Sequence, residues 1–359
     1  MKLFLIQTGS VKKKYLFLFL SFIIANTIVL GLYAYSRFLS ISKSSFIRFM
    51  PPHVIKNFKY LDLTYNSYYL AGVYHDHIYL GNYTAPLKFL ITDTNLENTK
   101  QAQIALADSQ ILNWDRARVK IEYPLVCLGD ESSSKILIAS FPALKLIHHY
   151  ILDTVHFDHV WQPLSAGSVV LRKYDDQKKQ NVLMTNKIDS VRNPNSSGVL
   201  EKQLDGKFCT DGSLLYDRAH SRLVYVYFYR NQFIVTDTNL HIISKFRTID
   251  TISTAKISLD TIYAENRVTF SSPPVIINKR ACIIDDWLLI HSGNLAANEE
   301  ADAGNNNSDI DIYDLKNGQY LYSFAITQFR NQKVKGLSAS GKKLILLYDS
   351  YLVTYDLNL

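Results

Sequence analysis

The first 50 residues contain no aspartate or glutamate, although they contain seven lysines and arginines. The whole chain of 359 residues has 39 lysines and arginines against 32 aspartates and glutamates, so residues 51–359 contain 32 of each and carry no net charge. Nucleic-acid-binding proteins usually present a basic surface, so the sequence predicts no nucleic-acid partner for this body. The positive surplus belongs to the N-terminal segment alone.

Cysteine is also scarce. The three residues, Cys127, Cys209 and Cys282, stand far apart and lack the paired spacing of metal-binding motifs. An odd number of distant cysteines does not indicate a disulfide framework, although it leaves open that one pair meets in space. Cysteines of this kind usually behave as small apolar residues, and we expect three buried thiols.

Sequence motifs of common enzymes are missing. The chain has no H-E-x-x-H zinc motif, no G-x-S-x-G nucleophile motif and no Asp-box of the sialidase kind. Gly336, Gly341 and Lys342 approach the spacing of a phosphate-binding loop. However, Lys343 replaces the required Ser/Thr, and a strand-like segment follows where a helix is needed. We therefore expect a β-turn there and no cofactor.

Glycine and proline are few, with 14 and 9 residues, whereas the chain has 24 tyrosines and 18 phenylalanines. Aromatic side chains favour β-structure, and helical periodicity is scarce after residue 53. The composition predicts an all-β body.

Residues 15–35 form an uncharged run of 21 residues with a single strongly polar side chain, Asn26. As a helix this run would cross the roughly 30 Å hydrocarbon core of a bilayer. We predict a transmembrane signal-anchor, preceded by a short basic segment at 1–14. A cleaved signal peptide is the alternative, but its apolar region is usually shorter. The basic residues before the run favour a cytoplasmic N-terminus and a body outside the cytoplasm, which is the periplasm in a bacterium.

Residues 36–52 are expected to form a juxtamembrane linker that ends at two prolines. Its cations, Arg37, Lys43 and Arg48, alternate with apolar residues, a pattern that suits lipid headgroups. The sequence thus predicts contact with the bilayer through residues 15–35 and their flanks.

A weak internal repeat runs through residues 53–359. Residues 89–96 (FLITDTNL) and 233–240 (FIVTDTNL) are nearly identical, and 310–318 and 352–359 share the pattern of a strand, an aspartate and a turn. Further apolar strands precede these copies at 77–83, 223–229, 287–292 and 344–349. Two weaker copies lie between them, the second of which pairs 168–174, 181–187 and 199–204. Most copies recur at 40–50 residues, the length of a four-stranded propeller blade.

Six copies predict a six-bladed β-propeller over residues 53–359. One interval between successive copies is longer than the others, because it contains a polar insertion at 292–308. We expect this insertion to be a flexible surface loop with solvated acidic side chains such as Glu299. The last copy lacks an outer strand, and residues 57–65 alternate like one. We predict that they close the ring by pairing with the C-terminal blade. Two β-sandwich domains are the alternative architecture.

This layout resembles six-bladed propellers of the TolB-like and NHL-like kind. Residues 337–344 (LSASGKKL) resemble the hairpin between the first two strands of TolB-type repeats, although Ala339 and Ser340 replace the family's Pro-Asp. The resemblance concerns architecture, and it does not imply an activity, because unrelated functions share the fold.

Histidines provide the only weak candidates for a metal or catalytic site. His75 and His77 would point to one face if both lay on a strand. His156 and His159 fall where the inner strand of the third blade is expected to begin, close to the ring axis. Spacing assigns no third or fourth ligand, so no metal or catalytic residue is assigned.

We therefore expect a membrane-anchored binding or scaffolding module for a protein or small ligand. The alternative is a propeller enzyme, such as a hydrolase, lyase or oxidoreductase, with its site in the axial pocket. Acidic and histidine side chains converging on the axis would favour the enzyme.

Overall fold

The structure is a computed structural model that describes residues 8–40, 44–106, 116–151, 156–164, 168–187, 190–262, 267–300 and 307–358. The chain divides into two compact units, Met1–Lys43 and Ser44–Leu359.

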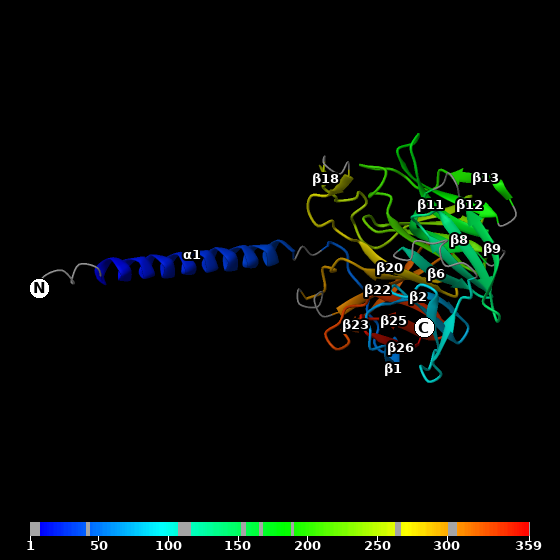
Figure 1. Cartoon of the computed structure of the whole chain (residues 1–359), viewed down its shortest axis with the longest axis horizontal. Helices are drawn as coiled ribbons and strands as arrows, with labels where there is room; N and C mark the ends of the chain where they lie inside the picture. The colour runs from blue at the N-terminus through cyan, green and yellow to red at the C-terminus, as the bar shows by residue number, and fades with distance from the viewer. Residues whose placement is uncertain are drawn as a thin grey trace, which may run out of the picture. The chain divides into compact units, whose positions relative to one another are not determined.

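The described residues of the first unit form one helix, α1 (Thr8–Ser40; Figure 1). Its segment Lys13–Tyr35 has a mean hydropathy of 2.2 and is long and apolar enough to cross a membrane, a criterion that a signal sequence also meets. The side chains of Asn26 and Thr27 donate hydrogen bonds to carbonyl groups one turn earlier, at 2.8 and 2.9 Å. Polar groups satisfied inside the helix lower the cost of placing it in hydrocarbon.

The second unit is a six-bladed β-propeller, as the sequence predicts, and not a pair of β-sandwiches. Each blade is an antiparallel four-stranded sheet. Blade 1 comprises β2 (Tyr68–Tyr74), β3 (His77–Asn82), β4 (Lys88–Asp93) and β5 (Lys100–Gln103). Blade 2 comprises β6 (Ala117–Glu122), β7 (Leu125–Asp130), β8 (Lys135–Ser140) and β9 (Lys145–Ile151). Blade 3 comprises β10 (Phe157–Pro163), β11 (Ser168–Asp175), β12 (Gln180–Lys187) and β13 (Ser190–Ser197).

The remaining blades follow the same order except at the point of closure. Blade 4 comprises β14 (Gly212–Asp217), β15 (Arg222–Tyr227), β16 (Gln232–Asp237) and β17 (Ile242–Arg247). Blade 5 comprises β20 (Asn278–Ile284), β21 (Trp287–Ser292), β22 (Asn307–Asp314) and β23 (Tyr320–Thr327). Blade 6 comprises β24 (Gly336–Ser340), β25 (Lys343–Leu347), β26 (Tyr351–Leu357) and β1 (Ile55–Asp62).

The ring is closed by the N-terminal strand of the propeller, which confirms the predicted pairing. β1 lies antiparallel to β26, with a register from Ile55 opposite Leu357 to Asp62 opposite Tyr351. The last blade therefore takes its outer strand from a segment about 300 residues earlier in the chain. This pairing removes the free edge that β26 would otherwise expose.

The repeated aspartate ends the third strand of its blade and organises the following turn. Asp93 accepts backbone hydrogen bonds from Glu97 and Asn98, at 3.0 and 3.1 Å. Asp237 accepts corresponding bonds from Asn239 and His241, at 2.9 and 2.8 Å. The side chain thus supplies the acceptor that a tight turn needs, which explains why the same residue type recurs.

Two parts of the strand assignment differ from the prediction. The outer strand of blade 3 is β13, and residues 199–204 form no strand. Val199 and Leu200 are instead buried in a hydrophobic cluster shared by blades 3 and 4. The long interval before blade 5 also contains a separate hairpin of β18 (Leu259–Ile262) and β19 (Arg267–Phe270). The apolar residues of the connecting segment 199–204 resemble those of a strand in the sequence because they too are buried.

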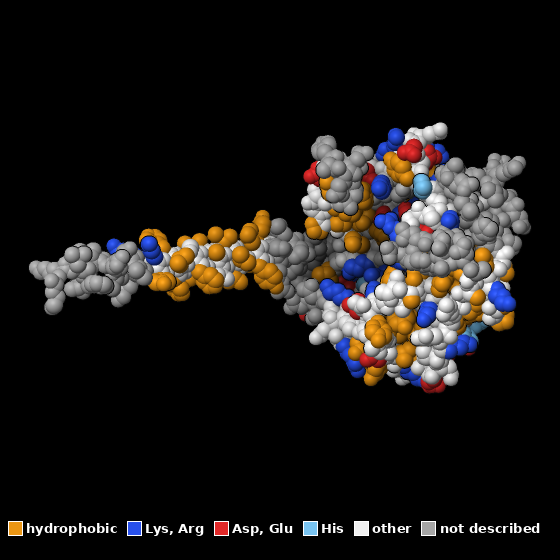
Figure 2. Space-filling view, viewed as in Figure 1, with side chains coloured by type: hydrophobic (Ala, Val, Ile, Leu, Met, Phe, Trp, Pro, Cys, Tyr) orange, Lys and Arg blue, Asp and Glu red, His pale blue; other side chains and the backbone are white. Residues whose placement is uncertain are grey.

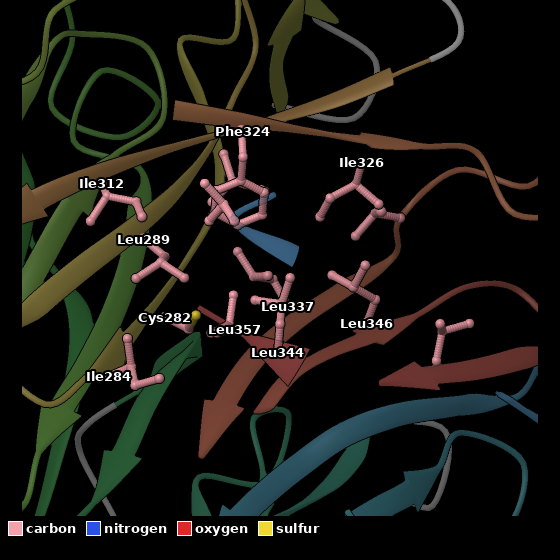
Figure 3. Close-up of a cluster of buried hydrophobic side chains, with 14 of the residues drawn as sticks. Cys282, Ile284, Leu289, Ile312, Phe324, Ile326, Leu337, Leu344, Leu346 and Leu357 are labelled. Carbon is pink, nitrogen blue, oxygen red and sulfur yellow. The ribbon is translucent and has the colours of Figure 1, made fainter. Parts of the chain in front are cut away.

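Neighbouring blades pack through apolar side chains. Between blades 5 and 6, for example, Leu289 and Phe324 lie in the same buried cluster as Leu344 (Figure 3). Burying such a side chain completely contributes roughly 1.5–3 kcal/mol to stability. All three cysteines are buried and free, as expected. The near-match to a phosphate loop is the turn between β24 and β25, with Gly341 at a φ of 54°.

Residues 44–50 are attached to blade 5 before the chain enters β1. The Ser44 amide donates to the carbonyl of Leu295 at 3.0 Å, and the Ala297 amide donates to the carbonyl of Phe46 at 2.8 Å. The Ser323 amide on β23 donates to the carbonyl of Phe49 at 2.8 Å. We call residues 44–50 the strap.

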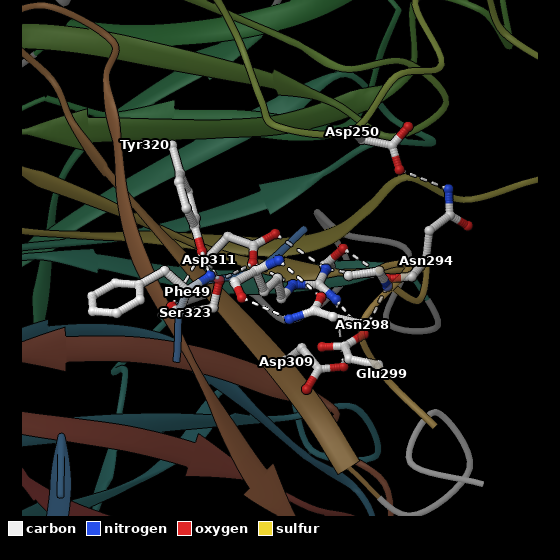
Figure 4. Close-up of polar contacts among 12 residues, drawn as sticks. Phe49, Asp250, Asn294, Asn298, Glu299, Asp309, Asp311, Tyr320 and Ser323 are labelled. Carbon is white, nitrogen blue, oxygen red and sulfur yellow. Dashed lines mark hydrogen bonds and ion pairs between the residues drawn. The ribbon is translucent and has the colours of Figure 1, made fainter. Parts of the chain in front are cut away.

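Arg48 anchors the strap inside the propeller through the carboxylates of Glu299, Asp309 and Asp311. Figure 4 shows these three side chains close together. The Arg48 guanidinium donates to Asp311 at 2.7 Å and to Glu299 at 2.6 Å, and Asp309 lies 3.9 Å away. Burial opposes the charge, but these carboxylates outweigh it and raise the pKa of Arg48. The expectation that Arg48 meets lipid headgroups is therefore wrong, and so is the expectation that Glu299 is solvated. Residues 301–306 lie outside the described part, and the flexibility of the insertion stays a prediction.

Removing the closing strand should prevent folding. A chain that begins at Asn66 should be unfolded or aggregated, because β26 and the blade 5–6 interface would lose their cover, whereas one that begins at Ser44 should fold. Circular dichroism and thermal unfolding would compare the two. A cooperative, soluble product from Asn66 would contradict the role of β1.

Replacing Arg48 by Met should destabilise the propeller by roughly 3–5 kcal/mol at pH 8, because three buried carboxylates lose their cation. Burial and the nearby Glu299 already raise the pKa of Asp309 to about 6. Asp309 therefore binds a proton at a higher pH in the folded state than in the unfolded chain. Acidification from pH 8 to 5 should reduce the stability that Arg48→Met loses, because a protonated carboxyl group needs no cation. Urea unfolding at both pH values measures this. Lys316→Met, which removes an exposed partner of Asp286, is the control and should change little.

Candidate functional site

The inner strands of all six blades enclose an axial cavity of about 280 Å³. Each of these strands is the terminal strand of its sheet, so one edge of each is not paired within the blade. Most side chains that line the cavity are apolar or small. They include Leu70, Ala71, Val73, Ile121, Leu215, Ala281, Cys282, Ile283, Leu337 and Ala339. Lys120 and Glu122, both on β6, are the only charged residues of the lining.

Lys120 is held against blade 3. Its Nζ donates a hydrogen bond to the Trp161 carbonyl and lies 4.9 Å from the centroid of the indole ring. Burial lowers the pKa of Lys120 to about 8, although Glu131 and Asp158 partly oppose the shift. The amine is therefore less basic than an exposed lysine.

Glu122 lies two residues further along β6. Burial raises its pKa to about 7, and the Arg218 guanidinium, 3.2 Å from its carboxylate, limits the rise. Lys120 and Glu122 are thus the two charged groups of the lining, and both have shifted pKa values. No acidic or histidine group joins them there, so a convergent catalytic set is lacking among the residues that line this cavity.

His156 and His159 lie where the sequence places them, at the start of the inner strand β10. The Nδ1 atom of His156 is 2.9 Å from the hydroxyl of Ser134. His159 lines a second cavity of about 220 Å³, which it shares with Lys120 and Ser213. A metal or catalytic role for the two histidines stays a prediction.

His75 and His77 do not share a strand. His75 occupies the turn between β2 and β3 with a φ of 48°, and His77 begins β3. The premise that both rings point to one face of a strand is therefore wrong. Across the described ranges, no group of three or more His, Cys, Asp or Glu side chains is arranged to hold a metal ion.

The sequence reasoning missed the charged residues of the axis. Residues 117–122 read ARVKIE, in which buried and partly buried residues alternate along β6. Because alternate residues share a face, this pattern already groups Arg118, Lys120 and Glu122. It also missed buried Arg172, which pairs with Asp158 and Asp211 at 2.7 Å each.

No family model matches the sequence, and no curated protein matches it. The fold is similar to the crystal structure of a member of the DUF4221 family from Bacteroides vulgatus. That chain is 12% identical with a TM-score of 0.50, and the match covers 88% of this chain and 98% of that one. A nidogen/laminin complex (10% identical, 76% and 85% covered) and the Cps50 (Swd1) propeller domain of Myceliophteria thermophila (9%, 86% and 100%) have TM-scores of 0.45. At these identities the DUF4221 likeness concerns the fold alone.

Replacing Lys120 by Met should stabilise the protein at pH 7, by roughly 1–3 kcal/mol, because it removes a buried charge. The folded state of the natural protein releases the Lys120 proton near pH 8, whereas the unfolded chain keeps it to near pH 10.5. The advantage of the variant should therefore shrink as the pH rises to 10. Denaturant unfolding at pH 7, 8.5 and 10 measures it. Lys202→Met, at an exposed loop position, should show no such trend.

Proposed function

We propose that this protein is a single-pass membrane protein whose propeller lies outside the cytoplasm and binds a ligand or partner at its axial face. The observation that carries the proposal is the axial cavity. It is bounded by all six blades, yet its lining holds only one acidic side chain, Glu122, and no histidine. A site of this composition suits recognition better than acid–base chemistry.

The membrane part of the proposal rests on α1 and its charges. The segment Lys13–Tyr35 is long and apolar enough to span a bilayer, and basic residues precede it. An excess of lysine and arginine usually stays on the cytoplasmic side, which supports an N-terminus inside and a propeller outside. In a bacterium, that compartment is the periplasm. We also keep the TolB-like subtype as part of the proposal, supported by the β24–β25 hairpin at 337–344.

A propeller enzyme is the second candidate, and one observation favours it. Lys120 lies between the axial cavity and the cavity lined by His159, and its pKa of about 8 suits proton transfer near neutral pH. An enzyme of this kind should lose turnover when Lys120 is replaced by Met, whereas a binding module has no turnover to lose.

Reporter fusions would test the topology. Alkaline phosphatase fused after Leu359 should be active in bacterial cells, and green fluorescent protein at the same position should stay dark, because only the phosphatase matures outside the cytoplasm. The natural chain should resist carbonate extraction from membranes. The double variant Ile23→Lys and Ile28→Lys, which places charges in the apolar run, should be extracted. A fluorescent fusion with inactive phosphatase would reverse the proposed orientation, and a soluble natural chain would exclude the anchor.

A further inference from the structure

Five basic residues lie at one end of the axial cavity. Arg280 directly precedes Ala281 in the lining, Lys335 stands two residues before Leu337, and Arg118 stands two residues before Lys120. At about 3.3 Å per residue, these side chains belong to the next level along the inner strands. We call Arg118, Lys279, Arg280, Lys333 and Lys335 the cationic rim.

Contacts connect three members of the rim: Arg118 and Lys335 lie against the Tyr83 ring, and Arg280 bonds to Lys335. The Arg118 guanidinium lies 4.5 Å from the centroid of the Tyr83 ring, and the Lys335 amine lies 5.9 Å from it. Arg280 donates from Nε to the carbonyl of Lys335 at 2.7 Å. The rim therefore extends continuously over blades 5, 6, 1 and 2. Figure 2 shows Lys and Arg side chains gathered in a hollow of the propeller face.

The rim is not neutralised in the way that other cations of this protein are. Arg48 and Arg172 are buried, and each forms ion pairs with at least two carboxylates. In contrast, no carboxylate among the described residues forms an ion pair with Lys279, Arg280 or Lys333. Among the described residues, Asp349 is the one carboxylate paired with Lys335, at 3.8 Å, and the Lys335 amine also donates to the Asn66 carbonyl at 2.8 Å.

Burial accordingly lowers the pKa of Lys279 and of Arg280. For Lys279, Asp309 opposes this shift, whereas Lys333 and Arg280 add to it. Two adjacent, half-buried cations without ion-pair partners are unfavourable unless an anion joins them.

A buried polar atom beside the rim also lacks a partner. His291 lies directly opposite Arg280 in the β20–β21 register, and its Nδ1 atom is buried with no hydrogen-bond partner. Burial, together with the charges of Lys279 and Arg280, lowers the pKa of His291 to about 3, so the ring is neutral. An unsatisfied buried ring nitrogen next to unpaired cations points to a missing polar ligand.

We propose that the cationic rim binds a phosphate group, from either a soluble phosphate ester or the headgroup of an anionic lipid. A phosphate presents several oxygens to several cations at once. Arg280 uses Nε for the Lys335 carbonyl, and its Nη atoms, which bond to no other described residue, can donate to such oxygens. The inference rests on the proposed binding role of the axial face and adds the chemistry of the ligand.

The strap gives a reason to include the lipid source. Ser44 is bonded to Leu295 in the loop after β21, and Ser292 at the end of β21 lies opposite Asn278, next to Lys279. The strap, which follows the apolar helix in the sequence, therefore contacts blade 5 at the end that carries the rim.

Calorimetric titration of the full chain in nonionic detergent with inorganic phosphate and glycerol 3-phosphate tests the soluble source. We expect at least one of them to bind with a Kd below about 1 mM, and the double variant Lys279→Gln, Arg280→Gln to weaken it at least tenfold. The matched control is Lys56→Gln, Lys342→Gln, which removes the same charge from exposed positions at the opposite end of blade 6. Equal weakening in both double variants would overturn the site, because it would show a general charge effect.

Nanodiscs test the lipid source with the same variants. Hydrogen exchange of β20 should slow in phosphatidylglycerol nanodiscs relative to phosphatidylcholine nanodiscs, and this protection should disappear in Lys279→Gln, Arg280→Gln. A positive result in either the titration or the nanodisc experiment supports the phosphate site and identifies the source of the phosphate. Negative results in both experiments overturn the proposal. If the double variant unfolds, Lys335→Gln, which removes a single partly exposed amine, replaces it. The topology reporters are independent of these results, so the membrane proposal and the phosphate proposal fail separately.

Discussion

The pairing of β1 with β26 is the constraint on which the rest of the propeller depends. A ring of blades buries its blade-to-blade interfaces only when the last blade meets the first, and blade 6 is completed by a strand from the other end of the body. The apolar cluster between blades 5 and 6, the axial cavity and the position of the strap all require this closure. The axial cavity therefore depends on contacts between residues that lie far apart in the sequence.

Charged residues fall into two physical classes around that ring. Arg48 and Arg172 are buried with two or more carboxylates each, so their charges are compensated inside the fold. The cations of the rim are half-buried or exposed, and Lys279, Arg280 and Lys333 form no ion pair with another described residue. Both kinds of cation occur in the same domain. Whether a cation is paired with carboxylates therefore depends on where it lies in the fold and not on the amino-acid composition. The paired cations stabilise the fold, whereas the unpaired cations of the rim leave a positive electrostatic potential at one end of the axial cavity.

The sequence was sufficient for the architecture and insufficient for the site. The FLITDTNL repeat predicted the third strands correctly because its aspartate has a local task, the turn that follows Asp93 and Asp237. Closure by β1 was predictable because an incomplete last repeat needs an outer strand. Arg48 was misassigned because its partners, Glu299 and Asp311, lie about 250 residues away, and no local pattern reports such a distance. The rim was missed for the same reason, since its members come from different blades, whereas the pair Arg118 and Lys120 was visible in the alternation of residues 117–122.

The order of the strands also sets the order of events during synthesis. β1 is made before any blade is complete, but its partner β26 ends at Leu357, about 300 residues later. At typical rates of 5–20 residues per second, the strand waits about 15–60 s without its partner. Arg48 waits similarly for Glu299 and Asp311. Both segments lie at the N-terminal end of the propeller, so the parts of it that are made first are the last to find their partners.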